Sequence, residues 1–426
     1  MRINIKESSI IIIEYIISIL IVLNCNSVFS NLVYKEYKFS EWIVILTFLL
    51  LCFLLIQDKL NSQFNGKLIL FVLIFWIYLF VFILFSVSSN RLLEFVAKFV
   101  IFIPIMTVCF YLYGKKGILF RMFYRIADIV IIIACISLTF WLLGSILGIL
   151  QPTGKVLYRW LNDVYINSYF NIYFETQKIS FMGFSGVRNT AIFTEAPMFS
   201  LILSISLLIE ICMKSEINKK RVVILLLAQL TTVSTTGWCF SIAIVIFKFM
   251  FTRSNKEHWY FKLLKWALLT VCIIVAVSVV NIVILEKSES SSYSIRMDDY
   301  IAGFKAWMDY PILGNGFGAN SAITYYMSSF RRDNLGFSNS IMNVLAQGGL
   351  YLFAVYIFPF ILYFREYFQK NNINLFLIGI GLMILFISTI FNGTFIMLLF
   401  LSLGYSLIFI EEYKKLDNWL IELIRT

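Results

Sequence analysis

Charged residues are scarce in this chain of 426 residues. Asp, Glu, Lys and Arg make up only 14% of the sequence, hydrophobic residues make up 60%, and the mean hydropathy is +0.87. A soluble domain has roughly a quarter charged residues and about half apolar ones. Apolar runs long enough to cross a hydrocarbon layer of ~30 Å recur along the whole chain. The composition therefore excludes a soluble globular protein and predicts an all-α, polytopic membrane protein, with residues 1–426 as one membrane domain.

Histidine and paired cysteine motifs are also lacking. The only histidine is His258, and the seven cysteines lie in or beside apolar runs without CxxC or Cys/His spacing. Zinc sites and disulfide frameworks need such spacing. The sequence predicts no metal site and no cofactor, with a metal at Asp298 and Asp299 as the less favoured alternative. The net charge of +11 fits basic cytoplasmic loops, so nucleic acid is not expected as a partner.

The apolar runs predict twelve transmembrane helices, the first of them retained rather than cleaved as a signal peptide. The block 222–251 can be interpreted as one helix or as two short ones. Basic residues flank both of its ends, which favours two short helices that meet at an outer turn. The residues around Asn392 and Gly393 have the same pattern. The expected spans are 9–26, 41–57, 67–88, 92–113, 126–150, 194–213, 222–235, 237–251, 264–285, 339–364, 374–391 and 394–411.

Two connections between these spans are long, residues 151–193 and 286–338. With twelve helices both termini are cytoplasmic and both long loops lie outside, and the excess of Lys and Arg on the inner side supports this orientation. Long loops are usually functional or disordered, and the many aromatic residues here favour an ordered surface next to the membrane. We therefore expect a multi-pass protein of the cytoplasmic (inner or plasma) membrane, with its active loops on the extracytoplasmic side.

Arg188 and Glu195 flank the point where the first large outer loop returns to the membrane. Pro197 suits the first turn of a helix, with Thr194 or Glu195 near its cap. One interpretation is a capped helix beside a surface arginine. The other is a site in which the arginine holds a phosphate and the carboxylate takes a proton from a hydroxyl.

The second large outer loop begins with a segment that predicts an amphipathic helix, Arg296–Met308, which could lie along the lipid surface. Three glycines follow Pro311 and predict a tight turn. Their backbone N–H groups could approach an anion, or the turn could simply join two surface segments. The glycines are Gly314, Gly316 and Gly318.

Further polar residues leave two interpretations open. Arg331 and Arg332 are expected to be exposed, either as substrate ligands or as anchors for lipid headgroups. Asn343, on one face of the tenth predicted helix with Gln347, could bind substrate or join helices. Glu94 and Lys98 are spaced as an i, i+4 pair and could be structural or part of a proton- or ion-coupled site.

Four stretches together resemble the O-antigen ligase/polymerase superfamily, over roughly residues 180–410. Ligases of that superfamily carry a histidine before the asparagine at the mouth of the helix, where this chain has Ser338 and Asn339. The resemblance is therefore to the polymerase branch, which Glu195-Ala196-Pro197 also suggests. The stretches are R-M-D-D-Y-I-A-G-F-K-A-W-M-D-Y-P-I-L-G-N-G-F-G (296–318), S-N-S-I-M-N-V-L-A-Q-G-G-L (338–350), R-N-T-A-I-F-T-E-A-P-M-F (188–199) and L-A-Q-L-T-T-V-S-T-T-G-W (227–238).

The resemblance implies a C-type glycosyltransferase-like bundle that joins undecaprenyl-pyrophosphate-linked repeat units at the outer face of the cytoplasmic membrane. The implied catalytic residues are Arg188 and Arg296, which would stabilise the pyrophosphate, and Glu195, which would act as the base. The expected partners are the lipid-linked oligosaccharide, membrane lipids and, as an open question, a chain-length regulator. The alternatives are a lipid-linked glycan flippase and a ligase-like transferase. The expected substrate-binding residues are Arg331, Arg332, Asp298, Asp299, Gly314, Gly316, Asn339 and Asn343.

Overall fold

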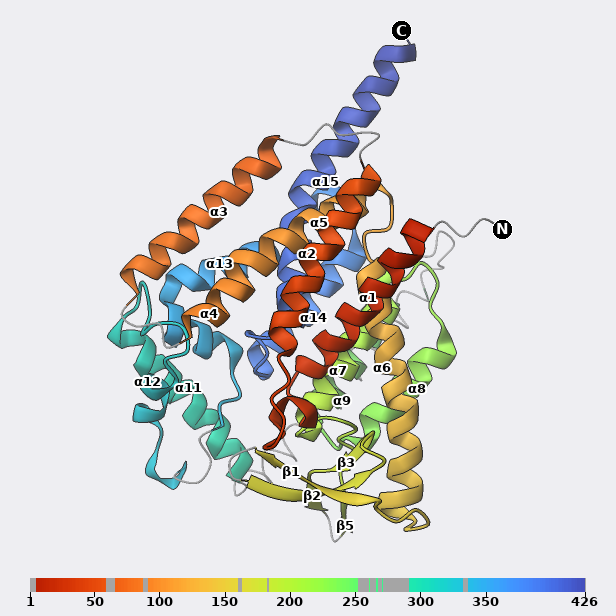
Figure 1. Ribbon diagram of the computed structural model, residues 1–426, viewed down its shortest axis with the longest axis vertical. Helices are drawn as coiled ribbons and strands as arrows, with labels where there is room; N and C mark the ends of the chain where they lie inside the picture. Colours follow the sequence, from red (N-terminus) through yellow and green to blue (C-terminus); the bar gives the residue numbers. More distant parts are fainter. Residues whose placement is uncertain are drawn as a thin grey trace.

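The computed structural model shows a bundle of helices with small β-sheets at one end (Figure 1). It describes residues 5–58, 66–86, 91–159, 163–181, 184–251, 260, 266, 270, 291–331 and 336–425. Most of the predicted span 264–285 lies outside the described residues, as do Arg332 and His258. The helical elements are α1 (Ile5–Asn24), η1 (Val28–Asn31), α2 (Phe39–Asp58), α3 (Gly66–Phe85), α4 (Leu92–Phe95), η2 (Val96–Phe102), α5 (Ile103–Lys115), α6 (Arg121–Phe140), η3 (Trp141–Ile146), α7 (Ala196–Leu208), η4 (Ile209–Met213), α8 (Lys219–Thr231), α9 (Thr235–Phe251), α11 (Ser291–Asp309), α12 (Asn320–Tyr326), η5 (Ser329–Arg331), α13 (Ser340–Lys370), α14 (Ile373–Ser388) and α15 (Phe395–Arg425).

Within the described residues, seven helices are long and apolar enough to cross a membrane. Three shorter apolar helices are present as well: Thr235–Met250, Ile373–Ser388 and Phe395–Ile410. A helix rises 1.5 Å per residue, so the shorter ones span less than a full hydrocarbon layer. The structure supports a helical, multi-pass membrane protein, while the predicted count of twelve is not confirmed.

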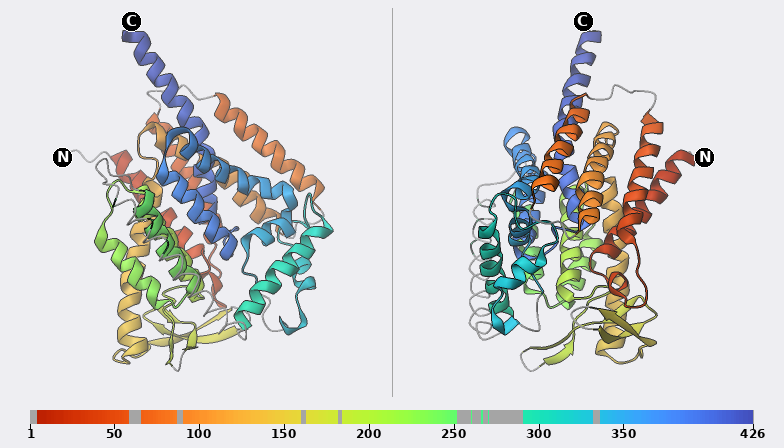
Figure 2. Two further views of the ribbon diagram at one scale, coloured as in Figure 1. Left: turned by 180° about the vertical axis from the view of Figure 1, so that it is seen from behind. Right: turned by 60° about the vertical axis from the view of Figure 1, so that its left-hand side comes forward.

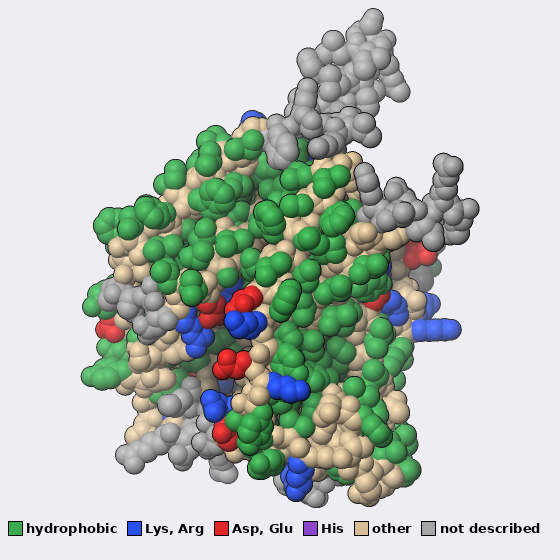
Figure 3. All heavy atoms as spheres, viewed as in Figure 1, with side chains coloured by type: hydrophobic (Ala, Val, Ile, Leu, Met, Phe, Trp, Pro, Cys, Tyr) green, Lys and Arg blue, Asp and Glu red, His purple; other side chains and the backbone are tan. Residues whose placement is uncertain are grey.

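Hydrophobic side chains cover the outside of the helices as well as the core. On α3 the exposed residues include Ile77 and Phe85, whose side chains are 65% and 66% accessible. Figure 3 shows hydrophobic side chains spread over the helical part of this face, with charges of both signs gathered lower, around α4 and toward the sheets. An apolar outer surface of this extent is stable when it contacts lipid rather than water.

Both chain termini lie toward one end of the bundle, and the two large loops lie toward the other (Figures 1 and 2). The first loop folds into two antiparallel sheets, which the sequence analysis did not predict. One sheet has the order β1-β2-β3, with Val156 opposite Ile166 and Ser168 opposite Phe174. The other pairs β4 with β5. The strands are β1 (Gly154–Arg159), β2 (Asp163–Tyr169), β3 (Tyr173–Glu175), β4 (Lys178–Phe181) and β5 (Phe184–Val187).

The block 222–251 forms two helices, α8 and α9, as predicted. The chain reverses at residues 232–234, where Val233 adopts a left-handed backbone with φ 48°. The Trp238 indole donates a hydrogen bond to the carbonyl of Gln229 across the turn. The predicted Glu94–Lys98 pair is also present, with Nζ 2.5 Å from Oε1.

The amphipathic helix predicted at Arg296–Met308 is present as the larger part of α11, which ends at Asp309. α11 packs along α13, and its Ala302 and Ala306 are buried beside Ala346. Small residues at these positions let the two helix backbones approach closely. The helix therefore lies against the bundle while Met308 and Phe304 remain exposed.

Candidate active site

A cavity of about 350 Å³ lies where both large loops meet the bundle. Its wall comes from the starts of α7, α9 and α13, the second turn of α11 and the end of α14. Its lining combines apolar side chains with hydroxyls and two charged residues, Glu195 and Arg296. The structure thus brings together the acid from the first loop and the arginine from the second.

Three helix N-termini converge on this cavity. Pro197 belongs to the first turn of α7, Thr236 to that of α9, and Ser338 directly precedes the cap of α13. The helix macrodipole places partial positive charge at each of these ends, although the N–H groups of Ala196 and Met342 already donate to Gln177 and Asn339. Together with the guanidinium of Arg296 they make the cavity favourable for an anion.

Glu195 is the N-cap residue of α7, but its side chain makes no capping hydrogen bond. The amide oxygen of Gln177, just before β4, accepts the hydrogen bond of the Ala196 N–H at 3.0 Å instead. Glu195 itself lies in the wall of the cavity.

Arg188 does not line the cavity. Its Nε and Nη2 donate to the carbonyls of Thr232 and Val233, at 2.8 and 3.2 Å, and so cap the end of α8. Burial lowers the pKa of Arg188 below its usual value, and the charge of Glu195 acts in the opposite direction. The sequence analysis left a surface arginine as the alternative, but the structure shows a half-buried one that links the α8–α9 turn to the region of Glu195.

Arg296 projects from α11 into the cavity wall, and both of its terminal nitrogens lie 3.4 Å from the hydroxyl oxygen of Thr236. Arg296 as a whole remains exposed to solvent. Long contacts to one neutral hydroxyl leave a guanidinium able to bind an anion in its forked geometry.

Arg331 corrects an expectation, because its side chain is fully buried instead of exposed. Its Nη1 lies 2.6 Å from Asp299 and 3.4 Å from Asp298, and its Nη2 donates to the carbonyl of Gly336. Asp299 in turn accepts hydrogen bonds from the N–H and the hydroxyl of Ser338, at 2.9 and 2.5 Å. Asp298, Asp299 and Arg331, expected to bind substrate, are thus engaged with one another, and their burial favours a role in positioning Ser338.

The glycine turn corrects a second expectation, since its N–H groups are already bonded within the protein. The N–H of Gly314 donates to Tyr310, that of Gly316 to the Gln347 carbonyl, and that of Gly318 to the Gln347 side chain. An anion-binding turn would need these groups to be available. Gly314 and Gly316 therefore do not form the anion cradle that the sequence suggested.

The glycine turn instead supplies hydrogen-bond partners at the point where α13 is interrupted. At Gly349 the backbone leaves the helix, with φ 56° and ψ −162°, so the hydrogen bonds around it are lost. The N–H groups of Leu350 and Tyr351 donate to the carbonyls of Pro311 and Ile312, and the carbonyls of residues 346 and 347 accept from the N–H groups of residues 315 and 316. The P-I-L-G-N-G turn and the Q-G-G segment thus complete each other's backbone hydrogen bonds.

Asn339 and Asn343, expected to bind substrate, are both buried at the start of α13. Asn339 caps this helix, and its Oδ1 accepts from the N–H of Met342 at 3.1 Å. The Nδ2 of Asn339 is buried without a hydrogen-bond partner. Gln347 bonds Gly318 and Asn320, so it joins α13 to the glycine turn.

The sequence analysis missed the hydroxyl groups of the cavity. Ser204 and Ser388 line it with oxygens that are buried and lack a partner, while Ser200 accepts from Gln229 Nε2 at 2.6 Å. The repeated serines of S-L-I-L-S (200–204) in an apolar helix could have indicated a polar site, because polar side chains in a membrane helix need a partner or a ligand. Among the described residues no three His, Cys, Asp or Glu side chains cluster as metal ligands would.

Residues 221–357 match the family model described as O-antigen ligase. The matched segment contains most of α8, all of α9, Arg296, Ser338 and the break in α13, and it supports the O-antigen ligase/polymerase superfamily. A search of curated proteins found no match to the chain. At the level of the family, the match supports a membrane enzyme of the glycosyltransferase type that acts on lipid-linked glycan.

Proposed function

We propose that the protein is a polysaccharide polymerase that joins undecaprenyl-pyrophosphate-linked repeat units at the outer face of the cytoplasmic membrane. The observation that carries this proposal is the cavity in which Arg296, Glu195 and three helix N-termini meet. Glycosyl transfer from a sugar pyrophosphate requires stabilisation of the departing pyrophosphate anion and a base that takes the proton of the attacking hydroxyl. This cavity offers both, at the end of a bundle whose outer surface suits a polyprenyl chain.

In the proposed reaction a sugar hydroxyl of one lipid-linked repeat unit attacks the anomeric carbon of a glycan carried by another. The new C–O bond forms as the bond to the pyrophosphate breaks, and undecaprenyl pyrophosphate leaves with the electron pair. The hydroxyl proton passes to Glu195, and Arg296 with the helix N-termini stabilises the leaving charge. Arg188, which caps α8, positions the turn that carries Thr236 beside Arg296.

Ser338 supports the polymerase branch over the ligase branch. Its hydroxyl donates to the buried Asp299, so its lone pairs remain to accept a hydrogen bond from a substrate hydroxyl. Bonded in this way it cannot supply the proton-transfer chemistry of an imidazole near neutral pH. The proposed base is therefore Glu195, and Asp298, Asp299 and Arg331 are positioning residues.

Purified protein incubated with lipid-linked repeat units tests the proposal. Polymer and free undecaprenyl pyrophosphate are expected from the native protein, with losses on the order of 100-fold for Glu195→Gln and for Arg296→Ala. Arg159→Ala is the matched control, since Arg159 is an exposed arginine of β1 that pairs with the exposed Asp163. Movement of repeat units across liposomes without polymer would establish a flippase, and transfer to a different acceptor would establish a ligase-like enzyme.

A further inference from the structure

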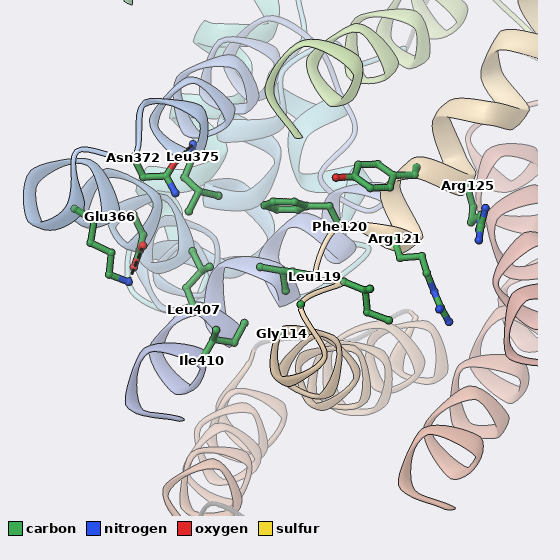
Figure 4. Close-up of a pocket in the computed structure, with 14 residues that line it drawn as sticks. Gly114, Leu119, Phe120, Arg121, Arg125, Glu366, Asn372, Leu375, Leu407 and Ile410 are labelled. Carbon is green, nitrogen blue, oxygen red and sulfur yellow. Dashed lines mark hydrogen bonds and ion pairs between the residues drawn. The ribbon is translucent and has the colours of Figure 1, made fainter. Parts of the chain in front are cut away.

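Hydroxyl side chains make up much of the wall of the candidate active site. Seven of the 17 residues that line it are Ser or Thr, and they come from α7, the start of α9 and the turn before it, the segment before α13 and the end of α14. A larger cavity, of about 620 Å³, lies at the other end of α14, where Asn372 and Leu375 line it (Figure 4). None of the described residues that line this larger cavity is Ser or Thr. The hydroxyls are therefore a property of the candidate active site and not of every cavity in the bundle.

The candidate active site has a charged part and a neutral part, arranged along α7. Glu195 is the N-cap residue of this helix, and Ser200 and Ser204 follow in the cavity wall at a spacing of four residues, which keeps them on one face. Ser204 is nine residues beyond Glu195, which corresponds to about 14 Å along the helix axis. Glu195 therefore lies where the chain enters from the first loop, and Ser204 lies more than two helical turns further into the bundle.

Two hydroxyls of this wall, those of Ser204 and Ser388, are buried and have no hydrogen-bond partner among the described residues. Ser204 itself is fully buried. By contrast, Ser200 accepts a hydrogen bond from Gln229, and Ser338 donates one to Asp299. A buried hydroxyl without a partner is unfavourable, so a ligand that bonds these two oxygens would remove that cost.

The chemistry of these two hydroxyls favours a sugar over the other parts of a lipid-linked glycan. A serine hydroxyl both donates and accepts hydrogen bonds, as the hydroxyls of a sugar do. A polyprenyl chain in the same space would leave both oxygens without a partner. A pyrophosphate only accepts hydrogen bonds, and it is best bound by the guanidinium of Arg296. Leu201 and Leu385, which line the same cavity, suit the apolar C–H face of a sugar ring.

We propose that Ser204 and Ser388 bind hydroxyl groups of the donor sugar, the one joined to the pyrophosphate, and so determine which sugar the enzyme accepts. This inference rests on the proposed function, since it takes the pyrophosphate to lie at Arg296. The cavity, of about 350 Å³, is near the lower end of the range of roughly 300–1,000 Å³ that is usual for small-molecule sites. That size suits a sugar ring rather than a long glycan.

Two probes test the inference on the full-length protein in nanodiscs. One is undecaprenyl pyrophosphate alone, and the other is undecaprenyl pyrophosphate that carries the repeat unit, extracted from cells that lack this protein. Native mass spectrometry measures the binding of each probe. Ser204→Ala and Ser388→Ala should each weaken binding of the sugar-bearing probe by about two- to tenfold and leave binding of undecaprenyl pyrophosphate unchanged.

Ser206→Ala is the matched control. Ser206 lies on the same helix, is fully buried and also has no hydrogen-bond partner among the described residues, but it does not line the cavity. Each of these variants removes a hydroxyl without a partner from an apolar surrounding, so thermal stability should stay unchanged or rise slightly. A difference in sugar binding between Ser204→Ala and Ser206→Ala therefore reports contact with the ligand.

Arg296→Ala separates a failure of this inference from a failure of the proposed function, because it should weaken binding of both probes. If it does so while the serine variants bind the sugar-bearing probe as Ser206→Ala does, the inference is wrong and the proposed function stands. Equal weakening of both probes in the serine variants would assign these hydroxyls to the pyrophosphate and would also overturn the inference. If the native protein binds neither probe, the proposed function itself is contradicted.

Discussion

The role of single residues here depends on the partners that the fold gives them. Arg188, Arg296 and Arg331 are all arginines of the two large loops, yet one caps a helix, one faces the cavity and one is buried between two carboxylates. The same guanidinium chemistry thus serves three purposes. Only Arg296 combines exposure with a place on the cavity wall.

Arg331→Ala is expected to lower the free energy of unfolding by roughly 3–5 kcal/mol, because it leaves Asp298 and Asp299 buried without their cation. Arg159→Ala should cost at most about 1 kcal/mol, since its ion pair with Asp163 is exposed. Thermal and denaturant unfolding of the two purified variants measures the difference. Similar stability of both variants would contradict the buried network.

Gln177→Ala is expected to destabilise the start of α7 by about 1 kcal/mol, because the Ala196 N–H loses its acceptor. It should also reduce polymer formation, because the start of α7 holds Glu195 in the wall of the cavity. Gln177→Glu is the control, because it keeps an acceptor oxygen at the same place. The prediction fails if both variants retain native stability and native rates in the assay with lipid-linked repeat units.

At the scale of elements, backbone hydrogen bonds between residues 311–316 of the glycine turn and residues 346–351 of α13 hold the second loop against the bundle. We call this contact the joint. Its backbone hydrogen bonds run in both directions across the break at Gly349. Each partner satisfies groups that the other has lost, so neither conformation is stable alone in an apolar setting. This joint places α11, and with it Arg296, over the starts of α7 and α9.

Gly349→Ala should destabilise the protein by about 1–3 kcal/mol from backbone strain alone, since φ is +56°. The added Cβ would also lie 2.3 Å from the carbonyl oxygen of Ile312, so the turn must move. Gly66→Ala is the control, because an added Cβ there meets nothing within 4 Å. Thermal unfolding measures both, and equal melting temperatures would exclude the joint as a source of stability.

At the scale of the whole molecule, the sheets and α11–α12 lie at one end and both chain termini toward the other (Figures 1 and 2). The candidate active site lies where the two large loops meet the bundle. If the sheet end is extracytoplasmic, as we propose, the reaction occurs at the outer face of the membrane.

Cysteine labelling in intact cells tests this orientation. Tyr165→Cys, at an exposed position of β2, should react with a membrane-impermeant thiol reagent, whereas Lys220→Cys at the start of α8 should react only after permeabilisation. The native protein, whose Cys135 and Cys239 are exposed on helices, provides the background. The reverse pattern would place the candidate active site in the cytoplasm.

Several features could be predicted from the sequence alone because they depend on local chemistry. Apolar length and basic flanks predicted the membrane helices and the α8–α9 reversal, and apolar periodicity predicted α11. The spacing of Glu94 and Lys98 predicted their ion pair. These signals operate within a few turns of chain, so no knowledge of distant contacts was needed.

Other features were decided only by tertiary structure. These features are the burial of Arg331, the capping of α7 by Gln177 instead of Glu195, and the docking of the glycine turn into α13. They join residues that are 19 to 39 positions apart in the chain. A strong hydrogen-bonding group looks the same in sequence whether it faces a ligand or a buried partner. Because the membrane interior offers no water, each such group must find its partner in the fold, and only the fold shows which groups remain for a substrate.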